Sequence, residues 1–173
     1  MKEIIFNDNN LKDSDIEKTV IRVKGLIVNS RNKLLLVYNN YTYQLPGGHL
    51  KDKEEIDGSL KREIKEEIGI DVVINEAPFL CIKTYDNDYC ETGSKVLNII
   101  YYYRIITDEL PNINYTHYDE LELLSDFKLY YVSLSGIRSF LKKAMNAEDI
   151  EASIYKEMMT TIDIYEEIYG RFV

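Results

Sequence analysis

The chain has 173 residues, of which 45% are hydrophobic and 29% are charged, a composition typical of a single folded domain with one core. Its net charge of −9 argues against long nucleic acids as partners, because affinity for their backbone comes mainly from lysine and arginine, but it does not exclude small nucleotides. No apolar run approaches the roughly 20 residues of a membrane helix, and residues 1–10 lack the features of a signal peptide, so we expect no membrane association.

The first predicted elements are two strands and a glycine loop. Residues 19–28 are rich in β-branched side chains and predict a strand, and residues 33–38 predict a second one. Residues 29–32 favour a turn, so the two strands are expected to pair as a hairpin. A connection then leads to Gly47 and Gly48, where the missing Cβ allows a positive φ and a close approach of the backbone to a ligand.

A charged amphipathic helix is predicted to follow the glycine loop. Its apolar positions recur every four residues, at Leu60, Ile64 and Ile68. Gly58 would weaken a first turn by roughly 1 kcal/mol, and Asp57 or Ser59 could cap a later start. We therefore expect the helix to begin near Ser59, after a loop over residues 49–58. Gly69 is placed to end the helix in αL geometry.

Three carboxylates of this helix share one face. Glu63, Glu66 and Glu67 have the spacing i, i+3, i+4, so their like charges repel by roughly a few tenths of a kcal/mol per exposed pair. A divalent cation between them would turn this repulsion into attraction. Hard oxygen ligands suit Mg²⁺ or Mn²⁺, so the cluster is a candidate metal site.

The second half of the chain alternates strands with polar loops. Strands are predicted over residues 70–74, 79–85, 95–107 and 127–132. Residues 86–94 are turn formers and acids, and residues 108–126 form a long acidic loop broken by Pro111, of a length that is often functional. Ser133 is expected to cap a helix that runs to about Met145.

A last amphipathic helix is predicted over residues 147–169. Its apolar positions are Ile150, Ile154, Met158, Ile162, Tyr165 and Tyr169, which fit the helical period. Such a stripe must be buried, either on its own domain or against a second copy in a symmetric homodimer. The helix could also close over a substrate cleft. These alternatives stay open at this point.

One contiguous stretch matches a known signature. After Gly48 come five residues, Glu54, seven residues, and then Arg62, Glu63, Ile64, Lys65, Glu66, Glu67, Ile68, Gly69 and Ile70. This stretch resembles the signature of the Nudix hydrolases, and the preceding Leu45 to Gly48 match the Leu-Pro-Gly-Gly that usually leads into it. The resemblance covers residues 19–145. It implies an α/β Nudix fold, with a mixed sheet in an α/β/α sandwich, an N-terminal extension over residues 1–18 and an extra C-terminal helix over residues 146–173.

The resemblance also implies a chemistry. The family hydrolyses a nucleoside diphosphate linked to another moiety, and its metals neutralise the diphosphate and activate water. The implied ligands of Mg²⁺ or Mn²⁺ are Glu63, Glu66, Glu67 and the carbonyl of Gly47. An ion pair between Glu54 and Arg62 would tie the loop to the helix, and Arg62 would orient Glu63.

The general base and the substrate contacts are less defined. In some relatives the base lies in the signature itself, which is Glu63 here, and in others on a later loop. Glu120, Glu122 and Asp126 are the candidates for such a loop, although each is more simply a solvated acid. Candidate contacts to the small nucleotide substrate are Arg22, Gly48, His49 and Tyr85. No signature for one substrate is visible.

Two other functions share this fold. A nucleotide-sensing module would have no chemical need for the three intact carboxylates, so they favour an enzyme. An isomerase of the same fold would need a Cys and Glu pair beside the glycine loop, which the sequence lacks. Cys81 and Cys90 form no CxxC pair, and a reduced cytoplasmic setting is the simplest interpretation.

Overall fold

A computed structural model describes residues 1–116 and 127–170 of the protein. Within them, one mixed sheet has the strand order β1-β6-β7-β2-β3-β4, with β5 paired to β2 and β8 paired to β3. The strands are β1 (Lys2–Phe6), β2 (Lys18–Val28), β3 (Lys33–Asn39), β4 (Thr42–Gln44), β5 (Gly47–His49), β6 (Leu80–Asp86), β7 (Val96–Ile106) and β8 (Lys128–Ser133). The helices are α1 (Ile56–Ile68), α3 (Ile137–Asn146) and α4 (Ala152–Tyr169), and short 3₁₀ turns are η1 (Asp13–Asp15), η2 (Tyr89–Glu91), η3 (Ile113–Tyr115) and η4 (Leu134–Gly136).

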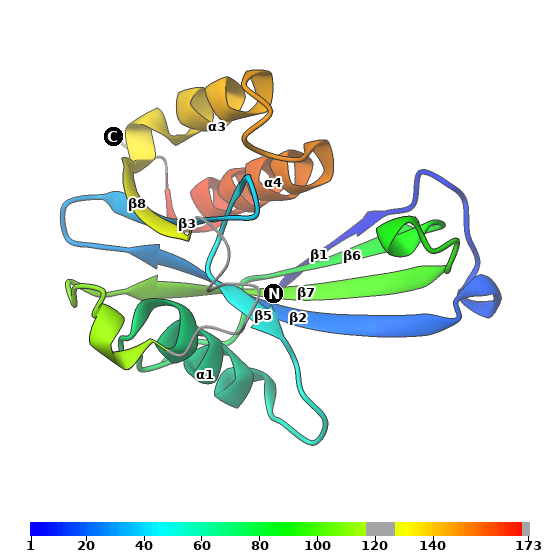
Figure 1. Ribbon diagram of the computed structural model, residues 1–173, viewed down its shortest axis with the longest axis horizontal. Helices are drawn as coiled ribbons and strands as arrows, with labels where there is room; N and C mark the ends of the chain where they lie inside the picture. Colours follow the sequence, from blue (N-terminus) through cyan, green and yellow to red (C-terminus); the bar gives the residue numbers. More distant parts are fainter. Residues whose placement is uncertain (117–126, 171–173) are drawn as a thin grey trace.

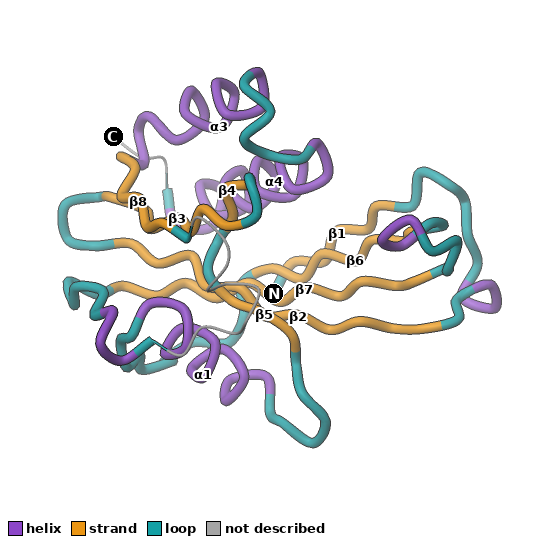
Figure 2. The backbone as a smooth tube through the Cα atoms, in the orientation of Figure 1, coloured by secondary structure: helices purple, strands orange, loops and turns teal. Residues whose placement is uncertain are grey.

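The sheet lies between two helical layers. Helix α1 covers one face, and α3 and α4 lie on the other (Figure 1). Strands β2 and β7 pair in parallel along their whole length, whereas β6 and β7 are antiparallel, so the sheet is mixed. Figure 2 shows these long strands at the centre, with the loop between β5 and α1 projecting from the molecule. The predicted α/β/α sandwich is confirmed.

Successive side chains of β2 point to opposite faces of the sheet and so contribute to two separate core clusters. Val23 and Ile27 pack in the cluster under α1, whereas Leu26 and Val28 pack in the cluster under α3 and α4. The predicted stripe of α1 is buried in the first cluster: Leu60, Ile64 and Ile68. Both faces of the central strands are therefore apolar for most of their length. Arg22 and Lys24 of β2 and Asn98 and Arg104 of β7 are among the exceptions, and they lie on the α4 side.

Helix α1 begins earlier than predicted. Its first residue is Ile56 rather than Ser59, and Glu55 precedes it in an extended conformation. Neither proposed cap acts as one, because Asp57 accepts a hydrogen bond from the Tyr103 hydroxyl at 2.5 Å and Ser59 is buried against the loop. Tertiary contacts thus compensate for the weak local signals. The predicted C-terminus is confirmed, since Gly69 has φ 72° and its N–H donates to the Lys65 carbonyl at 3.0 Å.

Several strand predictions need correction. No strand forms over residues 70–74, and Ile70 is apolar because it is buried against α1. Strand β1 was not predicted, yet it pairs in parallel with β6 from Lys2 to Phe6 and extends the sheet. The short strand β4 lies within and just beyond the expected connection. Ser133 does not cap α3, because the turn η4 intervenes and its hydroxyl lies against that of Ser135 at 2.9 Å.

Helix α4 packs on its own domain. It begins at Ala152, and its inner face joins the larger core cluster through Met158, Ile162, Ile164 and Tyr165. Arg138 of α3 pairs with Asp163 and Glu166 of α4 at 2.5 and 2.6 Å. This packing buries the predicted apolar stripe without a second copy, and a homodimer stays a prediction. Within residues 1–116 and 127–170, no helix is long and apolar enough to span a membrane.

Candidate active site

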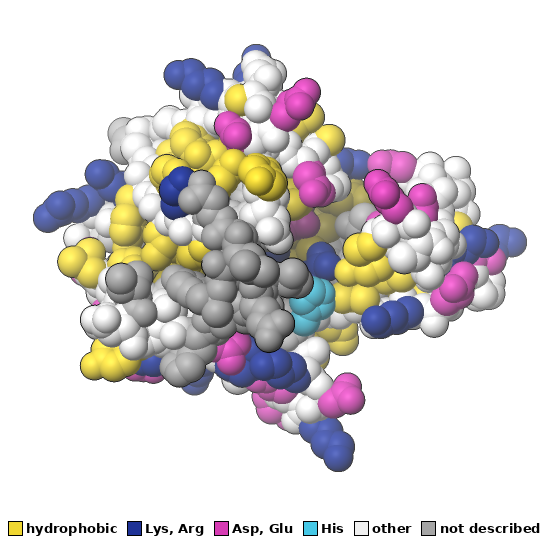
Figure 3. All heavy atoms as spheres, viewed as in Figure 1, with side chains coloured by type: hydrophobic (Ala, Val, Ile, Leu, Met, Phe, Trp, Pro, Cys, Tyr) yellow, Lys and Arg dark blue, Asp and Glu magenta, His cyan; other side chains and the backbone are white. Residues whose placement is uncertain are grey.

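A cleft of about 1140 Å³ opens beside the glycine loop. The glycine loop and α1 form one wall, and α4 with residues of β1, β2 and β7 forms the opposite one. The space-filling view shows the surface hollowed between α4 and the ends of β1 and β6 (Figure 3). All the predicted carboxylates of α1 line this cleft, together with Arg22, Gly47, Gly48 and His49.

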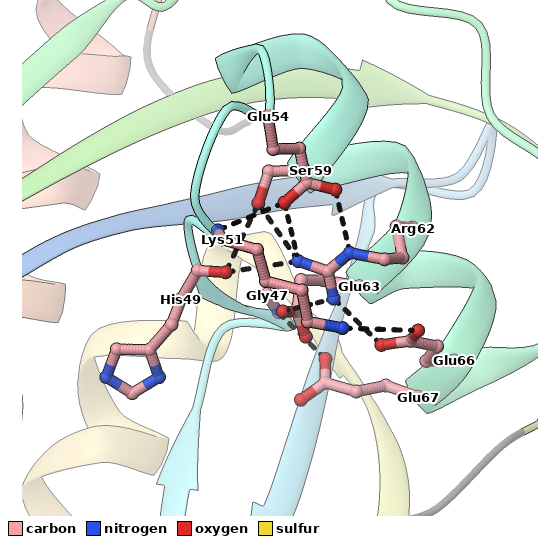
Figure 4. A network of polar contacts seen from close by, with 9 residues as sticks. All are labelled: Gly47, His49, Lys51, Glu54, Ser59, Arg62, Glu63, Glu66 and Glu67. Carbon is pink, nitrogen blue, oxygen red and sulfur yellow. Dashed lines mark hydrogen bonds and ion pairs between the residues drawn. The ribbon is translucent and has the colours of Figure 1, made fainter.

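Arg62 joins the loop before α1 to the carboxylates of the helix (Figure 4). Its guanidinium donates to Glu54 through Nε and Nη2, at 2.8 and 2.9 Å, in a two-pronged contact. Its Nη1 donates to Glu63 at 2.7 Å and to Glu66 at 2.9 Å. The expected ion pair with Glu54 is present, and hydrogen bonding to Arg62 lowers the pKa of Glu54 to about 2. Arg62 therefore offsets part of the negative charge of these acids and fixes their positions.

The glycines make room for these carboxylates. A Cβ on Gly48 would lie 2.4 Å from Oε2 of Glu63, and a Cβ on Gly47 would lie 2.1 Å from the Val23 carbonyl oxygen. Gly47 also has φ 132°, which favours glycine, and its N–H donates to Glu67 Oε2 at 2.7 Å. Burial raises the pKa of Glu63, while the bond from Arg62 opposes this shift. The glycine loop and α1 are therefore in direct contact, and a side chain at Gly48 would clash with Glu63.

The donor set suits a hard divalent cation. Three carboxylates from consecutive turns of one helix face the cleft, and oxygen is the ligand that Mg²⁺ and Mn²⁺ prefer. Within the described residues, no three acidic, histidine or cysteine side chains stand close enough to enclose an ion. The contacts of Arg62 and Gly47 explain this, because they hold the carboxylates. The chemistry fits a metal, and binding one would exchange some of these contacts for metal ligation.

Arg22 joins the glycine loop to the rim of the cleft. Its Nε donates to Nε2 of His49 at 3.0 Å, and its Nη2 donates to the Tyr89 hydroxyl at 2.8 Å. Burial and the charge of Arg22 lower the pKa of His49, so the imidazole is neutral at pH 7 and accepts this bond. A cationic group therefore stands at the cleft beside the carboxylates.

The remaining predicted site residues either lie away from the cleft or fall outside the described residues. Tyr85 does not line the cleft, because its side chain points to η1 and its hydroxyl donates to Asp13 at 2.6 Å. Successive side chains of a strand face opposite sides, and its neighbours Thr84 and Asp86 are the ones that reach the cleft. Among the described tyrosines, Tyr89 lines the cleft. The candidate bases Glu120, Glu122 and Asp126 lie outside the described residues.

The polar residues of the opposite wall were not predicted from the sequence. Lys24, Asn98 and Glu157 come from β2, β7 and α4, and all three line the cleft. Lys24 and Asn98 lie on strands that alternate polar with apolar residues on that face. A buried polar residue in such a strand is the signal that could have located them.

Comparisons with known proteins agree with this architecture. The family model described as the NUDIX domain matches residues 18–149. The NUDIX hydrolase from Nitrosomonas europaea superposes with a TM-score of 0.59 at 18% identity, over 89% of this chain and 93% of that one. The MutT protein from Methanosarcina mazei Go1 superposes with a TM-score of 0.52 at 22% identity, over 86% and 96% of the two chains. No curated protein gives a significant match to the sequence.

A larger protein shares the same fold in part. The bifunctional NMN adenylyltransferase/ADP ribose pyrophosphatase from Francisella tularensis superposes with a TM-score of 0.57 at 19% identity over 84% of this chain, which spans only 41% of that protein. A further structure of the Francisella protein contains AMP and a manganese ion. At these identities, the similarity of the solved structures shows the fold. The family model matches most of the sequence, and the chain therefore belongs to the Nudix family, whose enzymes hydrolyse phosphorus-containing anhydride bonds.

Proposed function

We propose that the protein hydrolyses a nucleoside diphosphate linked to another moiety, with Mg²⁺ or Mn²⁺ as its cofactor. The observation that carries this proposal is the group of three α1 carboxylates, which face a large cleft beside a glycine loop and a cationic Arg22. A bound metal would neutralise charge on the diphosphate and lower the pKa of the attacking water. Glu63, Glu66, Glu67 and the Gly47 carbonyl are the groups proposed to hold it.

Other residues of the site position the substrate and the carboxylates. Arg22 can donate to an oxygen of the diphosphate, because its guanidinium stands in the cleft between the glycine loop and the rim. Gly48 and His49 lie where that diphosphate would pass. Arg62 acts through the carboxylates that it holds, so it is a positioning residue.

The general base has two candidate sources. Glu63 stands in the cleft, and its raised pKa makes its carboxylate a better proton acceptor near neutral pH. The alternative is one of Glu120, Glu122 and Asp126. Alanine variants of these three separate the alternatives, because loss of the base lowers kcat with little effect on metal affinity. If all three variants keep wild-type turnover, the assignment passes to Glu63 or to a metal-activated water.

A hydrolysis screen tests the function as a whole. The full chain is incubated with nucleotide sugars, dinucleoside polyphosphates and (deoxy)nucleoside triphosphates, each with Mg²⁺, with Mn²⁺ and with excess chelator. We expect metal-dependent release of a phosphate-containing product from at least one class. Tight nucleotide binding without turnover under any condition would instead identify a sensing module.

Two further properties belong to the same proposal. Cys81 is buried and Cys90 is exposed, and both are free thiols, which supports a reducing, cytoplasmic setting. A homodimer stays a prediction, and the mass of the protein on a sizing column with light scattering tests it. Dimerisation would have to use a surface other than the inner face of α4, because that face is buried in the domain.

A further inference from the structure

The glycine loop and α1 form one wall of the cleft, which we call the signature wall, and a buried ion pair lies in the opposite wall. Lys24 of β2 and Glu157 of α4 stand 3.3 Å apart, between Nζ and Oε1, and their side chains are only 7% and 14% exposed. Removing two charges from water carries a cost that their mutual attraction repays only with good geometry and further hydrogen bonds. Both side chains line the cleft. The pair therefore sits where a ligand can supply the missing bonds.

The wall around this pair has unused hydrogen-bonding capacity. The buried amide oxygens Asn98 Oδ1 and Asn39 Oδ1 accept no hydrogen bond from any described residue, whereas Glu157 has the Lys24 ammonium and the buried Tyr102 hydroxyl beside it. Asn98 is 6% exposed, and it lines the cleft together with Asn39. Buried polar groups in proteins are nearly always paired, and each unpaired one carries a free-energy cost. Two unpaired amide oxygens beside a buried ion pair are a feature of a site whose partner comes from outside the described residues.

The charge of this region differs from that of the signature wall. Lys24 pairs with Glu157 and Lys156 pairs with Asp8, so these four charges balance, whereas Arg62 alone does not balance the three carboxylates of the signature wall. A diphosphate therefore suits the end of the cleft near Arg22 and α1, and an uncharged polar group suits the end near α4. Ile100 and Ile154 add apolar surface beside the pair, which a flat ring can contact.

We propose that the α4 end of the cleft binds the uncharged heterocyclic ring of the substrate and that Lys24, Asn98 and Glu157 recognise its edge. Lys24 donates, Glu157 accepts, and the Asn98 amide can do either, so the wall matches a ring edge with a donor next to an acceptor. The inference rests on the proposed function for the rest of the substrate. Binding of the ring itself is independent of hydrolysis.

The position of Glu157 makes α4 the selectivity element. The family model ends at residue 149, so this helix lies beyond the matched region. Lys156 pairs with Asp8 at 3.0 Å and lies over the Phe6 ring, and Glu167 pairs with Lys2, so α4 is held beside the N-terminal strand. Both attachments lie outside the matched residues as well. Ring selectivity in this protein is thus attributed to α4, which lies beyond the matched region, acting together with Lys24 and Asn98 of the matched sheet.

The first test compares the binding of nucleosides, which have a heterocyclic ring but no phosphate, with the binding of ribose, which lacks the ring. Binding to the full chain without metal is measured by ligand-observed NMR or calorimetry. We expect at least one nucleoside to bind about tenfold more tightly than ribose, and Glu157→Gln to weaken it by about tenfold, as for the loss of a hydrogen bond to a charged group. Glu166→Gln is the matched control, because Glu166 lies on the same helix in an ion pair with Arg138, outside the cleft.

Glu157→Gln leaves Lys24 without its counter-charge and can therefore destabilise the protein. A second variant tests the inference without this unpaired charge. Lys24→Met combined with Glu157→Leu replaces the pair by apolar groups of similar size, which proteins usually tolerate. With a hydrolysed substrate series that differs only in the ring, this variant should raise KM for the preferred member by about tenfold and reduce the discrimination, with kcat within about threefold. Nucleosides that bind no better than ribose, or folded variants that keep wild-type affinity and selectivity, would overturn the inference. Nucleoside binding without any hydrolysis would support it and overturn the proposed function alone.

Discussion

The two walls of the cleft both hold charged side chains, but they hold them differently. In the signature wall, Arg62 donates hydrogen bonds to Glu54, Glu63 and Glu66, all at 2.9 Å or less. In the opposite wall, Lys24 and Glu157 make a single contact at 3.3 Å beside unpaired amide oxygens. The first wall is an internally satisfied network, and the second leaves hydrogen bonds unmade.

This difference separates the chemistry from the recognition of the substrate. The signature wall is built from the contiguous residues 47–69, so its geometry is set by one loop and one helix. The opposite wall draws on strands and a helix that are distant in the sequence. A change in α4 can therefore alter the recognised ring without moving the carboxylates.

The largest effect is expected from removing the wall that α4 forms. Deleting residues 147–173 exposes the core that Ile150, Met158, Ile162 and Tyr165 cover. At roughly 1.5–3 kcal/mol for each large buried side chain, the loss approaches the whole stability of a domain. We expect the truncated chain to lack a cooperative thermal transition by circular dichroism. A folded, active truncation that is monomeric on a sizing column would show that α4 is dispensable.

A single substitution in α4 tests the same packing with a smaller loss of stability. Ile162→Ala should lower the unfolding free energy by about 2–5 kcal/mol in denaturant titration, because Ile162 is only 2% exposed. Ile168→Ala on the same helix is the control, since Ile168 is 45% exposed. Equal effects of the two variants would contradict the assignment of the buried face.

The next effect concerns the signature wall. Glu67→Gln keeps the shape of the side chain but removes the charge of a proposed metal ligand, so kcat should fall by at least about 100-fold, as for the loss of electrostatic stabilisation in a transition state. Manganese binding, followed by electron paramagnetic resonance, should weaken in parallel. Glu55→Gln serves as the control, because Glu55 is exposed just before α1. Full activity of Glu67→Gln, or of the wild type in excess chelator, would remove the metal from the mechanism.

The same contrast explains what could be predicted from the sequence. The position of α1, its end at Gly69 and the pairing of Glu54 with Arg62 follow from residues that are close in the chain, and the structure contains all three. The start of α1 was predicted wrongly. Its first turn is held by contacts such as Asp57 with Tyr103, which propensities do not include.

Features that depend on distant pairing escaped prediction. Strand β1 is short, and its partner β6 is remote in the sequence, so no local pattern marks it. The sequence of residues 70–74 predicts a strand, but packing against the core cluster under α1 selects the same apolar side chains without one. Lys24, Asn98 and Glu157 are ordinary residues one at a time, and only the fold brings them together.

A moderate effect is expected from changing the cation of the signature wall. Arg62→Lys keeps the charge but loses the planar fork that reaches several carboxylates at once. We expect kcat to fall by about tenfold and KM to change little, because the carboxylates lose their orientation while the opposite wall is unaffected. Steady-state kinetics on the best substrate check this. A selective rise in KM instead would place Arg62 among the substrate contacts.

The smallest effect is a pH dependence that belongs to the signature wall alone. The pKa of Glu54 is about 2 in the folded protein, because Arg62 donates to its carboxylate, and it is higher in the unfolded chain. A depressed folded pKa contributes stability above the unfolded pKa of about 4.3, and this contribution is lost as the pH falls from there toward 2. Arg62 stays charged throughout.

Glu54→Gln isolates this contribution. At pH 7 the variant should be less stable than the wild type by about 1–2 kcal/mol, a value reduced for partial exposure to solvent, and the gap should narrow as the pH falls from 5 to 3. Urea titrations at several pH values measure it, with Glu55→Gln as the exposed control on the same loop. A gap that stays constant over this range would mean that Glu54 acts through packing or through neutral hydrogen bonds. The Lys24–Glu157 wall should be insensitive to the substitution, so nucleoside affinity at pH 7 should be unchanged.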